Sequence, residues 1–160
     1  MYALLMVKNE ADVVTKTLKA VASRAEKIFV FDTGSTDNTV EICKNYAPHI
    51  EVKEGPWVNF AVSRNEALKW VENEVPRDSW ILMLDAADEL RGLSSAFADE
   101  LRLHDSKING ILIKYVWFND DSKSRLERRE LKLIRAGRGW RWKHPVHEML
   151  CNDKPNCIVS

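Results

Sequence analysis

Short apolar segments alternate with helical patterns through the first half of the chain, and this order constrains the fold more than any other feature. The apolar segments are Tyr2–Val7, 28–31, 50–52 and Trp80–Leu84. Three of them are apolar without interruption, which is typical of strands that are buried on both faces. Strands that alternate with helices favour a parallel sheet covered on both sides. The sequence therefore predicts an α/β fold with a Rossmann-like, mostly parallel central sheet.

Helical patterns occupy the intervals between these strands. The first interval is helical because apolar residues share one face, namely Val14, Leu18, Val21 and Ala22. The second helix follows a turn-rich segment and runs toward Tyr46, with Thr36 or Asp37 available to cap it. The third helix spans residues 59–74, after the break at Gly55-Pro56.

The second half of the chain departs from this alternation. Residues 93–103 have a helical pattern, and 109–118, 132–135 and 146–150 have the composition of strands. This order predicts a mixed sheet, and no linker separates the halves. We expect one domain over residues 1–160, with a nucleotide-binding half to about residue 90 and an acceptor-binding, catalytic half after it.

Composition excludes several classes of protein. Hydrophobic residues make up 45% of the chain, which is too many for a disordered protein. The chain has 24 basic and 24 acidic residues, and this balance argues against a nucleic-acid-binding protein. The basic stretch from Lys123 to Lys143 suits either a phosphate or acceptor site or a solvated face. A membrane-spanning helix needs about 20 apolar residues, and no apolar run of the chain is nearly that long. The N-terminus does not resemble a signal peptide.

The cysteines indicate a reducing compartment. Cys43, Cys151 and Cys157 are odd in number and lack the spacing of a zinc site. Reduced thiols in a cytoplasmic protein are the simplest interpretation, and a disulfide between Cys151 and Cys157 is the alternative.

Polar clusters follow three of the predicted strands. Lys8, Asn9 and Glu10 follow the first, Asp32 and Thr33 follow the second, and an acidic segment follows the fourth. In open α/β sheets, ligands bind at the carboxyl ends of the strands. We therefore expect these clusters to lie along one edge, although Asp32 also suits a capping or turn role.

The acidic segment Asp85-Ala86-Ala87-Asp88-Glu89 suits a divalent cation. Grouped carboxylates repel each other unless a cation or hydrogen-bond donors neutralise them. Mg²⁺ and Mn²⁺ prefer oxygen ligands, and they usually take one or two carboxylates plus substrate phosphates. An acidic helix N-terminus is the competing interpretation of these residues.

Two further segments carry candidate site residues. Arg64 shares a helix face with Phe60, Leu68 and Val71, so its guanidinium needs an anionic partner, either a phosphate or a carboxylate. The late segment His144-Pro145-Val146-His147-Glu148 lies beside Trp140 and Trp142. Histidine can bind metal or phosphate, glutamate can act as a general base, and tryptophan can stack on a sugar.

Five segments together resemble a known family. They are V-K-N-E, F-D-T-G-S-T-D-N-T, F-A-V-S-R-N-E-A-L, W-I-L-M-L-D-A-A-D-E and W-K-H-P-V-H-E, in that order. The chain resembles the family 2 glycosyltransferases of the GT-A fold over about residues 3–150. The likeness is closer to the branch of lipopolysaccharide-core glucosyltransferases and large-DNA-virus glycosyltransferases.

The resemblance implies roles for particular residues. Asp32 and Thr33 would lie at the nucleoside pocket with Lys8, Asn9 and Glu10 beside it, and Arg64 would hold the nucleotide. Asp85 and Asp88 would match the D-x-D element, with Asp88 the direct ligand of Mn²⁺ or Mg²⁺ and His147 a further ligand. His147 and Glu148 would match the H-E element near the acceptor.

The chain departs from the family pattern at three points. An additional alanine separates Asp85 from Asp88, which leaves open whether Asp85, Asp88 or Glu89 binds the metal. Thr33 stands where many relatives carry a second aspartate. Relatives often continue past the H-E element, so part of the acceptor site is expected to be missing.

The predicted function is metal-dependent, inverting transfer of a sugar from a nucleotide-diphosphate sugar, with uridine the expected base. The acceptor would be a hydroxyl of a glycan, a lipid-linked molecule or another compound. Glu148 is the predicted general base, with Asp120 or Asp121 in reserve, while Arg64 and basic residues near Arg135 and Arg138 would assist the leaving group. A sugar nucleotidyltransferase and a non-catalytic nucleotide- or glycan-binding domain are the alternatives.

Overall fold

Four parallel strands form the first half of the central sheet. The computed structural model describes residues 1–90, 97–101, 107–119, 124–153 and 158–159. The strands β1 (Tyr2–Val7), β2 (Ile28–Asp32), β3 (Ile50–Glu54) and β4 (Trp80–Leu84) lie in the order β3-β2-β1-β4. Every residue of β2 and β4 is buried, as the continuous apolar runs predict. The predicted α/β fold is confirmed.

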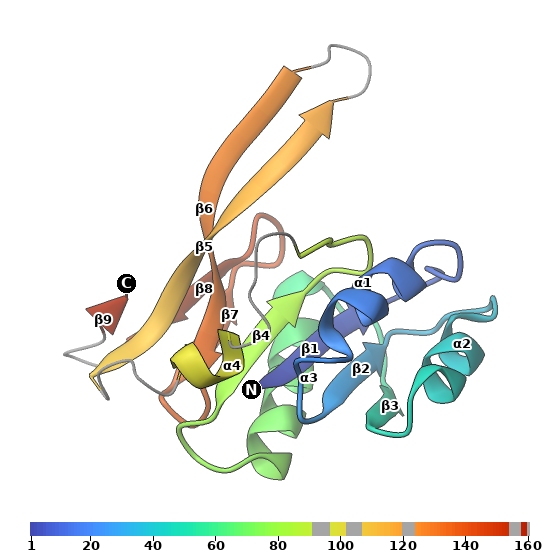
Figure 1. Cartoon of the computed structure of the whole chain (residues 1–160), viewed down its shortest axis with the longest axis horizontal. Coiled ribbons are helices and arrows are strands. Elements are labelled where there is room, and N and C mark those ends of the chain that lie inside the picture. The colour runs from blue at the N-terminus through green and yellow to red at the C-terminus, as the bar shows by residue number, and fades with distance from the viewer. Residues whose placement is uncertain (91–96, 102–106, 120–123, 154–157, 160) are drawn as a thin grey trace.

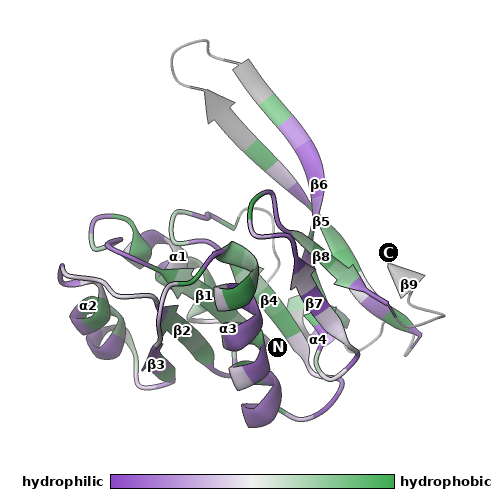
Figure 2. Cartoon of the chain, turned by 180° about the vertical axis from the view of Figure 1, so that it is seen from behind, coloured by the Kyte–Doolittle hydropathy of each residue, from purple (hydrophilic) through white to green (hydrophobic). Residues whose placement is uncertain are grey.

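Helices cover both faces of this parallel sheet. Figure 1 shows α1 (Val14–Val21) and α2 (Thr39–Tyr46) in front of the strands, and Figure 2, from behind, shows α3 (Phe60–Glu74) on the other face. Alternate residues of each strand point to opposite sides, so two apolar clusters form. One joins α1 and Cys43 to β1, β2 and β4, and the other joins α3 to the same strands.

The helix starts follow local capping chemistry. Asn59 precedes α3, and its side-chain oxygen accepts a hydrogen bond of 2.9 Å from the backbone nitrogen of Val62. Asn38, not Thr36 or Asp37, is the residue before α2, and it makes no side-chain cap. Of the two predicted capping residues, Asp37 provides the side chain, because it accepts a bond of 3.0 Å from the backbone nitrogen of Thr39, the first residue of the helix.

One predicted core residue of α3 lies at the surface. Phe60 is exposed and packs edge-on against Trp57, with ring centroids 4.9 Å apart. The buried face of the helix instead consists of Ala61, Ser63, Ala67, Leu68, Trp70 and Val71. Phe60 is the first residue of the helix and does not belong to its buried face.

The second half of the chain extends the sheet with mixed strand directions, as predicted. The strands β6 (Ser124–Arg135) and β5 (Ile108–Asn119) continue beyond β4, and both β4–β6 and β6–β5 are antiparallel pairs. The strand β9 (Ile158–Val159) adds to β5 in parallel. A short helix, α4 (Phe97–Glu100), lies within the predicted 93–103 segment, most of which is outside the described residues.

The strands β5 and β6 form a ribbon that projects from the body of the molecule (Figure 1). β6 begins at Ser124, eight residues before the predicted strand at 132–135. In the coloured part of the ribbon, hydrophilic and hydrophobic residues alternate along the strands (Figure 2), and charged residues lie at Lys114 and from Glu127 to Glu130. They pair across the strands, as Lys114 and Glu127 do at 2.7 Å.

A second, two-stranded sheet carries the late histidine segment. It pairs β7 (Trp140–Lys143) with β8 (Met149–Asn152), so the predicted strand at 146–150 starts three residues too early. His144 and His147 have positive φ angles of 70° and 53°, which turn the connecting loop and end the strand pattern there. The side chain of Asn65 on α3 bonds to both the backbone nitrogen and the oxygen of Trp142, each at 2.8 Å.

No helix within the described ranges is both long enough and apolar enough to cross a membrane. Cys43 and Cys151 are free thiols, so the alternative disulfide of Cys151 is not formed, and Cys157 lies outside the described residues.

Burial, together with the nearby charge of Asp32, raises the pKa of the Cys43 thiol to about 11. We expect a disulfide reagent at pH 8 to leave Cys43 unmodified in the folded protein and to modify the half-buried Cys151. Peptide mass spectrometry after labelling distinguishes the two sites, with urea-unfolded protein as the positive control. Equal labelling of both thiols in the folded protein would contradict the packing of Cys43.

Candidate active site

The polar clusters that follow the strands lie along one edge of the sheet. Val7 pairs with Asp32, and Leu5 pairs with both Val30 and Leu84, so the carboxyl ends of β1, β2 and β4 are neighbours. Asp85 follows β4 directly. Because the three strands are parallel, Asp32 and the acidic segment share this edge, which confirms the predicted placement.

The additional alanine is accommodated in a tight turn. The backbone nitrogen of Asp88 donates to the oxygen of Asp85 at 3.0 Å, and the backbone nitrogen of Asp85 donates to Oδ2 of Asp88 at 2.9 Å. Ala86 is buried and Ala87 is exposed. The turn brings the carboxylate of Asp88 back toward Asp85, so the two acidic groups stay together despite the inserted residue.

The side chain of Thr17 in α1 contacts the backbone of this turn. Its hydroxyl is fully buried and lies 2.7 Å from the oxygen of Ala86, 2.8 Å from that of Asp88 and 3.3 Å from that of Asp85. A hydroxyl has one proton, so it donates to one of these carbonyl oxygens at a time. The contact fixes the acidic turn to the first helix.

We expect Thr17→Val to lower the free energy of unfolding by about 1–3 kcal/mol, because the turn carbonyls lose a buried donor. Urea unfolding measures the change. The control is Thr15→Val, at an exposed position of the same helix, which should change stability by less than about 0.5 kcal/mol. Equal stability of the two variants would show that the Thr17 hydroxyl does not hold the turn.

Ion pairs join the acidic turn to α3 and β6 and, through Arg64, to the loop between β7 and β8. Arg64 of α3 contacts Asp85 at 2.8 Å through its Nη2 and Glu148 at 3.2 Å through its Nε. Lys132 of β6 lies 3.2 Å from Asp85 and 3.4 Å from Asp88. The side chains of Arg64, Lys132 and Glu148 are each less than one-fifth exposed. The guanidinium of Arg64 therefore has carboxylate partners, one of the two options that its position predicts.

These contacts fix the charges of the cluster. Burial acts to raise the pKa of Asp85, but the positive charges of Arg64 and Lys132 outweigh it and hold that pKa below its usual value. Burial likewise acts to lower the pKa of Lys132, but the charges of Asp85, Asp88 and Glu130 outweigh it and raise that pKa. Both side chains are therefore ionised at neutral pH.

A cavity of about 430 Å³ opens beside this cluster. Its lining includes Arg64, Asp85, Lys132, Trp142, His147 and Glu148. The guanidinium of Arg64 lies 5.0 Å from the centre of the Trp142 ring. Trp142 therefore forms part of the predicted wall, but Trp140 does not. Trp140 is buried in the core, and its indole nitrogen donates to the oxygen of Asn109 at 3.1 Å.

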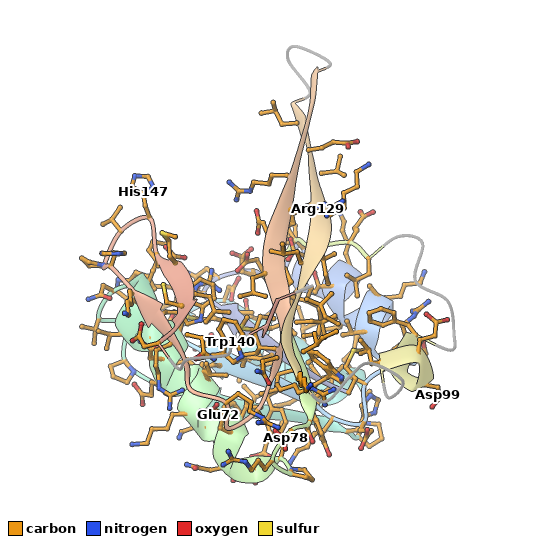
Figure 3. The ribbon with its side chains drawn as sticks, turned by 90° about the vertical axis from the view of Figure 1, so that its left-hand side faces the viewer. Glu72, Asp78, Asp99, Arg129, Trp140 and His147 are labelled. Carbon is orange, nitrogen blue, oxygen red and sulfur yellow. The ribbon has the colours of Figure 1, made fainter. Side chains whose placement is uncertain are left out.

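The predicted metal ligands are brought together only in part. Oδ2 of Asp85 and Oδ2 of Asp88 both face the ammonium of Lys132, so two carboxylate oxygens converge on one cation position. His147 is exposed in the β7–β8 loop, where Figure 3 labels it. Within the part of the chain that the structure describes, no three His, Cys, Asp or Glu side chains gather as a metal site.

Two carboxylates nevertheless fit a metal–diphosphate site, since Mg²⁺ is usually held by one or two carboxylates and the substrate phosphates. Asp85 and Asp88 supply the hard oxygen ligands that such an ion needs. Glu89 is exposed, whereas Asp88 is buried and Asp85 is intermediate in exposure. The arrangement favours Asp85 and Asp88 over Glu89 as the ligands.

The predicted nucleoside-binding residues are engaged with one another. The carboxylate of Asp32 is buried and accepts bonds from the backbone nitrogens of Gly34 and Ser35, at 3.0 and 2.9 Å. The hydroxyl of Thr33 donates to the oxygen of Val7 at 3.2 Å. These contacts favour the turn role of Asp32, and a direct contact of either residue with a base stays a prediction.

The loop after β1 is tied to the loop after β2. Asn9, at a positive φ of 55°, accepts a bond of 2.7 Å from the backbone nitrogen of Thr36, and Glu10 donates its backbone nitrogen to Thr39 at 2.7 Å. Lys8 and Asn9 are exposed. The two loops therefore form one polar rim beside the acidic turn.

Arg135 and Arg138 lie at the opposite end of the sheet, so their predicted role at the leaving group is wrong. β6 runs antiparallel to β4, and Arg135 pairs with Trp80 at the start of β4, far along the strand from Asp85. Both arginines contact Asp78. In Figure 3, Asp78 lies near the bottom of the molecule, whereas His147, which lines the cavity, lies at the upper left.

Four residues of the site were not predicted individually, namely Lys132, Glu130, Arg128 and Tyr115. The hydroxyl of Tyr115 donates to Oδ1 of Asp88 at 2.7 Å. Only the pairing of β6 with β4 and β5 brings them to the acidic turn. The basic stretch from Lys123 to Lys143 contains Lys132, which was the one available signal. Asp120 and Asp121, the reserve bases, lie outside the described residues.

Comparisons with known proteins agree with this geometry. The profile of Glycosyl transferase family 2 matches residues 3–94. The SPbeta prophage-derived glycosyltransferase SunS of Bacillus subtilis (strain 168) is 35% identical over 83 residues, which make up 51% of this chain and 18% of that protein. An uncharacterized glycosyltransferase of Rickettsia bellii is 30% identical over 99 residues, 62% of this chain and 30% of that protein. The chain thus spans less than a third of these relatives.

Solved structures show the same fold. S. aureus TarS 1–349 in complex with UDP-GlcNAc matches with a TM-score of 0.54 and 20% identity, over 71% of this chain and 33% of that chain. Its complex with UDP matches with a TM-score of 0.53 and 22% identity, over 71% and 35% of the two chains. The profile covers more than half of the chain and includes the acidic turn, so the protein belongs to Glycosyl transferase family 2.

Proposed function

We propose that this domain transfers a sugar from a nucleoside diphosphate sugar to a hydroxyl acceptor, with inversion at the anomeric carbon. One observation carries the proposal. Arg64 joins Asp85, at the carboxyl edge of the sheet, to Glu148, at the end of the β7–β8 loop. The carboxylate proposed to bind the cation and the candidate base therefore line the same cavity of about 430 Å³.

The charge of the cluster supports a divalent cation as cofactor. Among the described residues, its ion pairs contain four carboxylates, from Asp85, Asp88, Glu130 and Glu148, and three cations, from Arg64, Arg128 and Lys132. A diphosphate brings further negative charge to this acidic set, so binding it needs additional positive charge. Mn²⁺ or Mg²⁺ held by Asp85 and Asp88 would supply that charge and stabilise the departing diphosphate.

The residues of the chain perform the remaining steps. Glu148 accepts the proton of the acceptor hydroxyl as the oxygen attacks the anomeric carbon. The bond between that carbon and the diphosphate oxygen breaks, and the diphosphate leaves with the electron pair. Arg64 keeps the Glu148 carboxylate oriented toward the cavity through its Nε contact of 3.2 Å. Trp142 offers an apolar wall beside the same cavity.

UDP is the nucleotide that we propose for the donor. TarS, which shares the fold, has been crystallised with UDP and with UDP-GlcNAc. The polar rim formed by the loops after β1 and β2 is the proposed nucleoside site. It holds Lys8, Asn9, Glu10, Asp32 and Thr33 at the sheet edge beside the acidic turn.

Thermal-shift and UDP-release measurements test the proposal. A ligand that binds the folded state raises its melting temperature by mass action. We expect UDP with Mn²⁺ to raise Tm more than UDP with a chelator does, and a UDP-sugar with Mn²⁺ to release UDP. Stabilisation by UDP without sugar release from any UDP-sugar would instead indicate a non-catalytic binding domain. Pyrophosphate release from a nucleoside triphosphate and a sugar phosphate would indicate a nucleotidyltransferase.

A further inference from the structure

The ammonium of Lys132 occupies the point on which the acidic side chains converge. Its Nζ lies 3.2 Å from Asp85, 3.4 Å from Asp88 and 3.6 Å from Glu130. It also lies 5.1 Å from the centre of the Tyr115 ring. The side chain is 13% exposed. Lys132 is thus the counter-ion shared by three carboxylates in a partly desolvated site.

A divalent cation would use the same oxygens. Oδ2 of Asp85 and Oδ2 of Asp88 are the atoms that face Lys132, and they are the oxygen ligands that Mg²⁺ or Mn²⁺ prefers. Two cations cannot share this position, because each repels the other at such short range. Binding of the metal therefore requires the ammonium to move away.

Lysine is suited to such an exchange. Its ammonium is a compact charge on a flexible four-carbon stem, whereas the planar guanidinium of arginine forms fixed, paired contacts. Without a cation, the grouped carboxylates of Asp85 and Asp88 would repel each other. Asp88 is also fixed by Tyr115 and by the backbone nitrogen of Asp85, so its carboxylate stays in place when Lys132 leaves.

We propose that Lys132 is a resident cation of the Asp85–Asp88 pair and yields its position when a divalent ion arrives with the donor diphosphate. The role of the ion rests on the proposed function. Once released, the ammonium finds a new partner in the diphosphate. The metal alone therefore binds weakly, because the ammonium of Lys132 gives up its ion pairs with the carboxylates and gains no new partner. For the same reason, the metal and the nucleotide strengthen each other's binding.

Direct measurement of Mn²⁺ binding without nucleotide tests this inference. The free Mn²⁺ signal in electron paramagnetic resonance gives the Kd for the wild type, Lys132→Met and Lys132→Arg. We expect Lys132→Met to bind Mn²⁺ at least about tenfold more tightly than the wild type, because the competing charge is gone. Lys132→Arg keeps that charge and should bind no more tightly than the wild type. The matched control is Lys114→Met, which removes an exposed lysine of the neighbouring strand.

Thermal unfolding provides a second readout. Lys132→Met should melt below the wild type in a chelator and recover in Mn²⁺, whereas Mn²⁺ alone should shift the wild type little. If Lys132→Met does not fold, Lys132→Gln replaces it in both measurements. Equal Mn²⁺ affinity in the wild type and the uncharged variant, including no binding by either, would overturn the inference. The test uses no nucleotide, so it is separate from the UDP-release test of the proposed function.

Discussion

Glu148→Gln is expected to lower kcat for sugar transfer by about 100-fold or more. The reason is the loss of the general base, a contribution that is typically worth about 10²–10⁴ in rate. Glutamine has nearly the same shape, and its oxygen can still accept the bond that Arg64 donates to Glu148. Donor binding and Tm should therefore change little. Steady-state kinetics with the donor and acceptor, alongside the Kd for UDP, measure the two effects separately.

The control for this substitution is Glu74→Gln. Glu74 is exposed at the last residue of α3, at the end of the helix away from Arg64. It should retain the wild-type kcat. Normal transfer by Glu148→Gln would show that Glu148 is not the general base, because an amide cannot take the proton of the acceptor hydroxyl.

Arg64→Met is expected to produce the largest loss of stability. The substitution leaves Asp85 and Glu148 without their shared guanidinium in a partly buried site. Removal of one partner from a buried ion pair typically costs about 3–5 kcal/mol. Asp85 is 44% exposed, so solvent screens part of this effect and we expect about 3 kcal/mol. A domain of this size would lose roughly 6–12 °C in Tm.

Lys69→Met provides the matched control, because Lys69 is an exposed residue of the same helix. Its Tm should stay near that of the wild type, which differential scanning calorimetry can verify. A Tm for Arg64→Met within about one degree of the control would mean that the ion pairs of Arg64 contribute nothing measurable, as many exposed pairs do.

The parallel half of the fold was predictable because its strands are buried on both faces. The runs at Tyr2–Val7 and Trp80–Leu84 contain no polar residue, and the structure has strands over those same residues. β6 was predicted only at its end, because residues 126–129 are all exposed and four consecutive charged residues, 127–130, remove the apolar alternation of a strand. The two-residue strand β9 is too short to leave a periodic signal.

The candidate site was predictable where it follows the parallel strands. Asp85 and Asp88 lie at the predicted edge because the strands are parallel, so that residues directly after any of them lie at the same edge of the sheet. Lys132 was missed and Arg135 was misplaced for one reason, the antiparallel direction of β6. Three residues along a strand span about 10 Å, enough to separate the site from the far end of the sheet. That direction depends on a long-range pairing, which no local pattern encodes.

Anomalous X-ray diffraction from crystals grown with UDP and Mn²⁺ would test the central claim most directly. We predict an anomalous peak within bonding distance of the Asp85 and Asp88 carboxylates, with diphosphate oxygens on the same ion and Lys132 withdrawn from the pair. A diphosphate bound away from these two carboxylates, or a manganese peak at another part of the chain, would contradict the account.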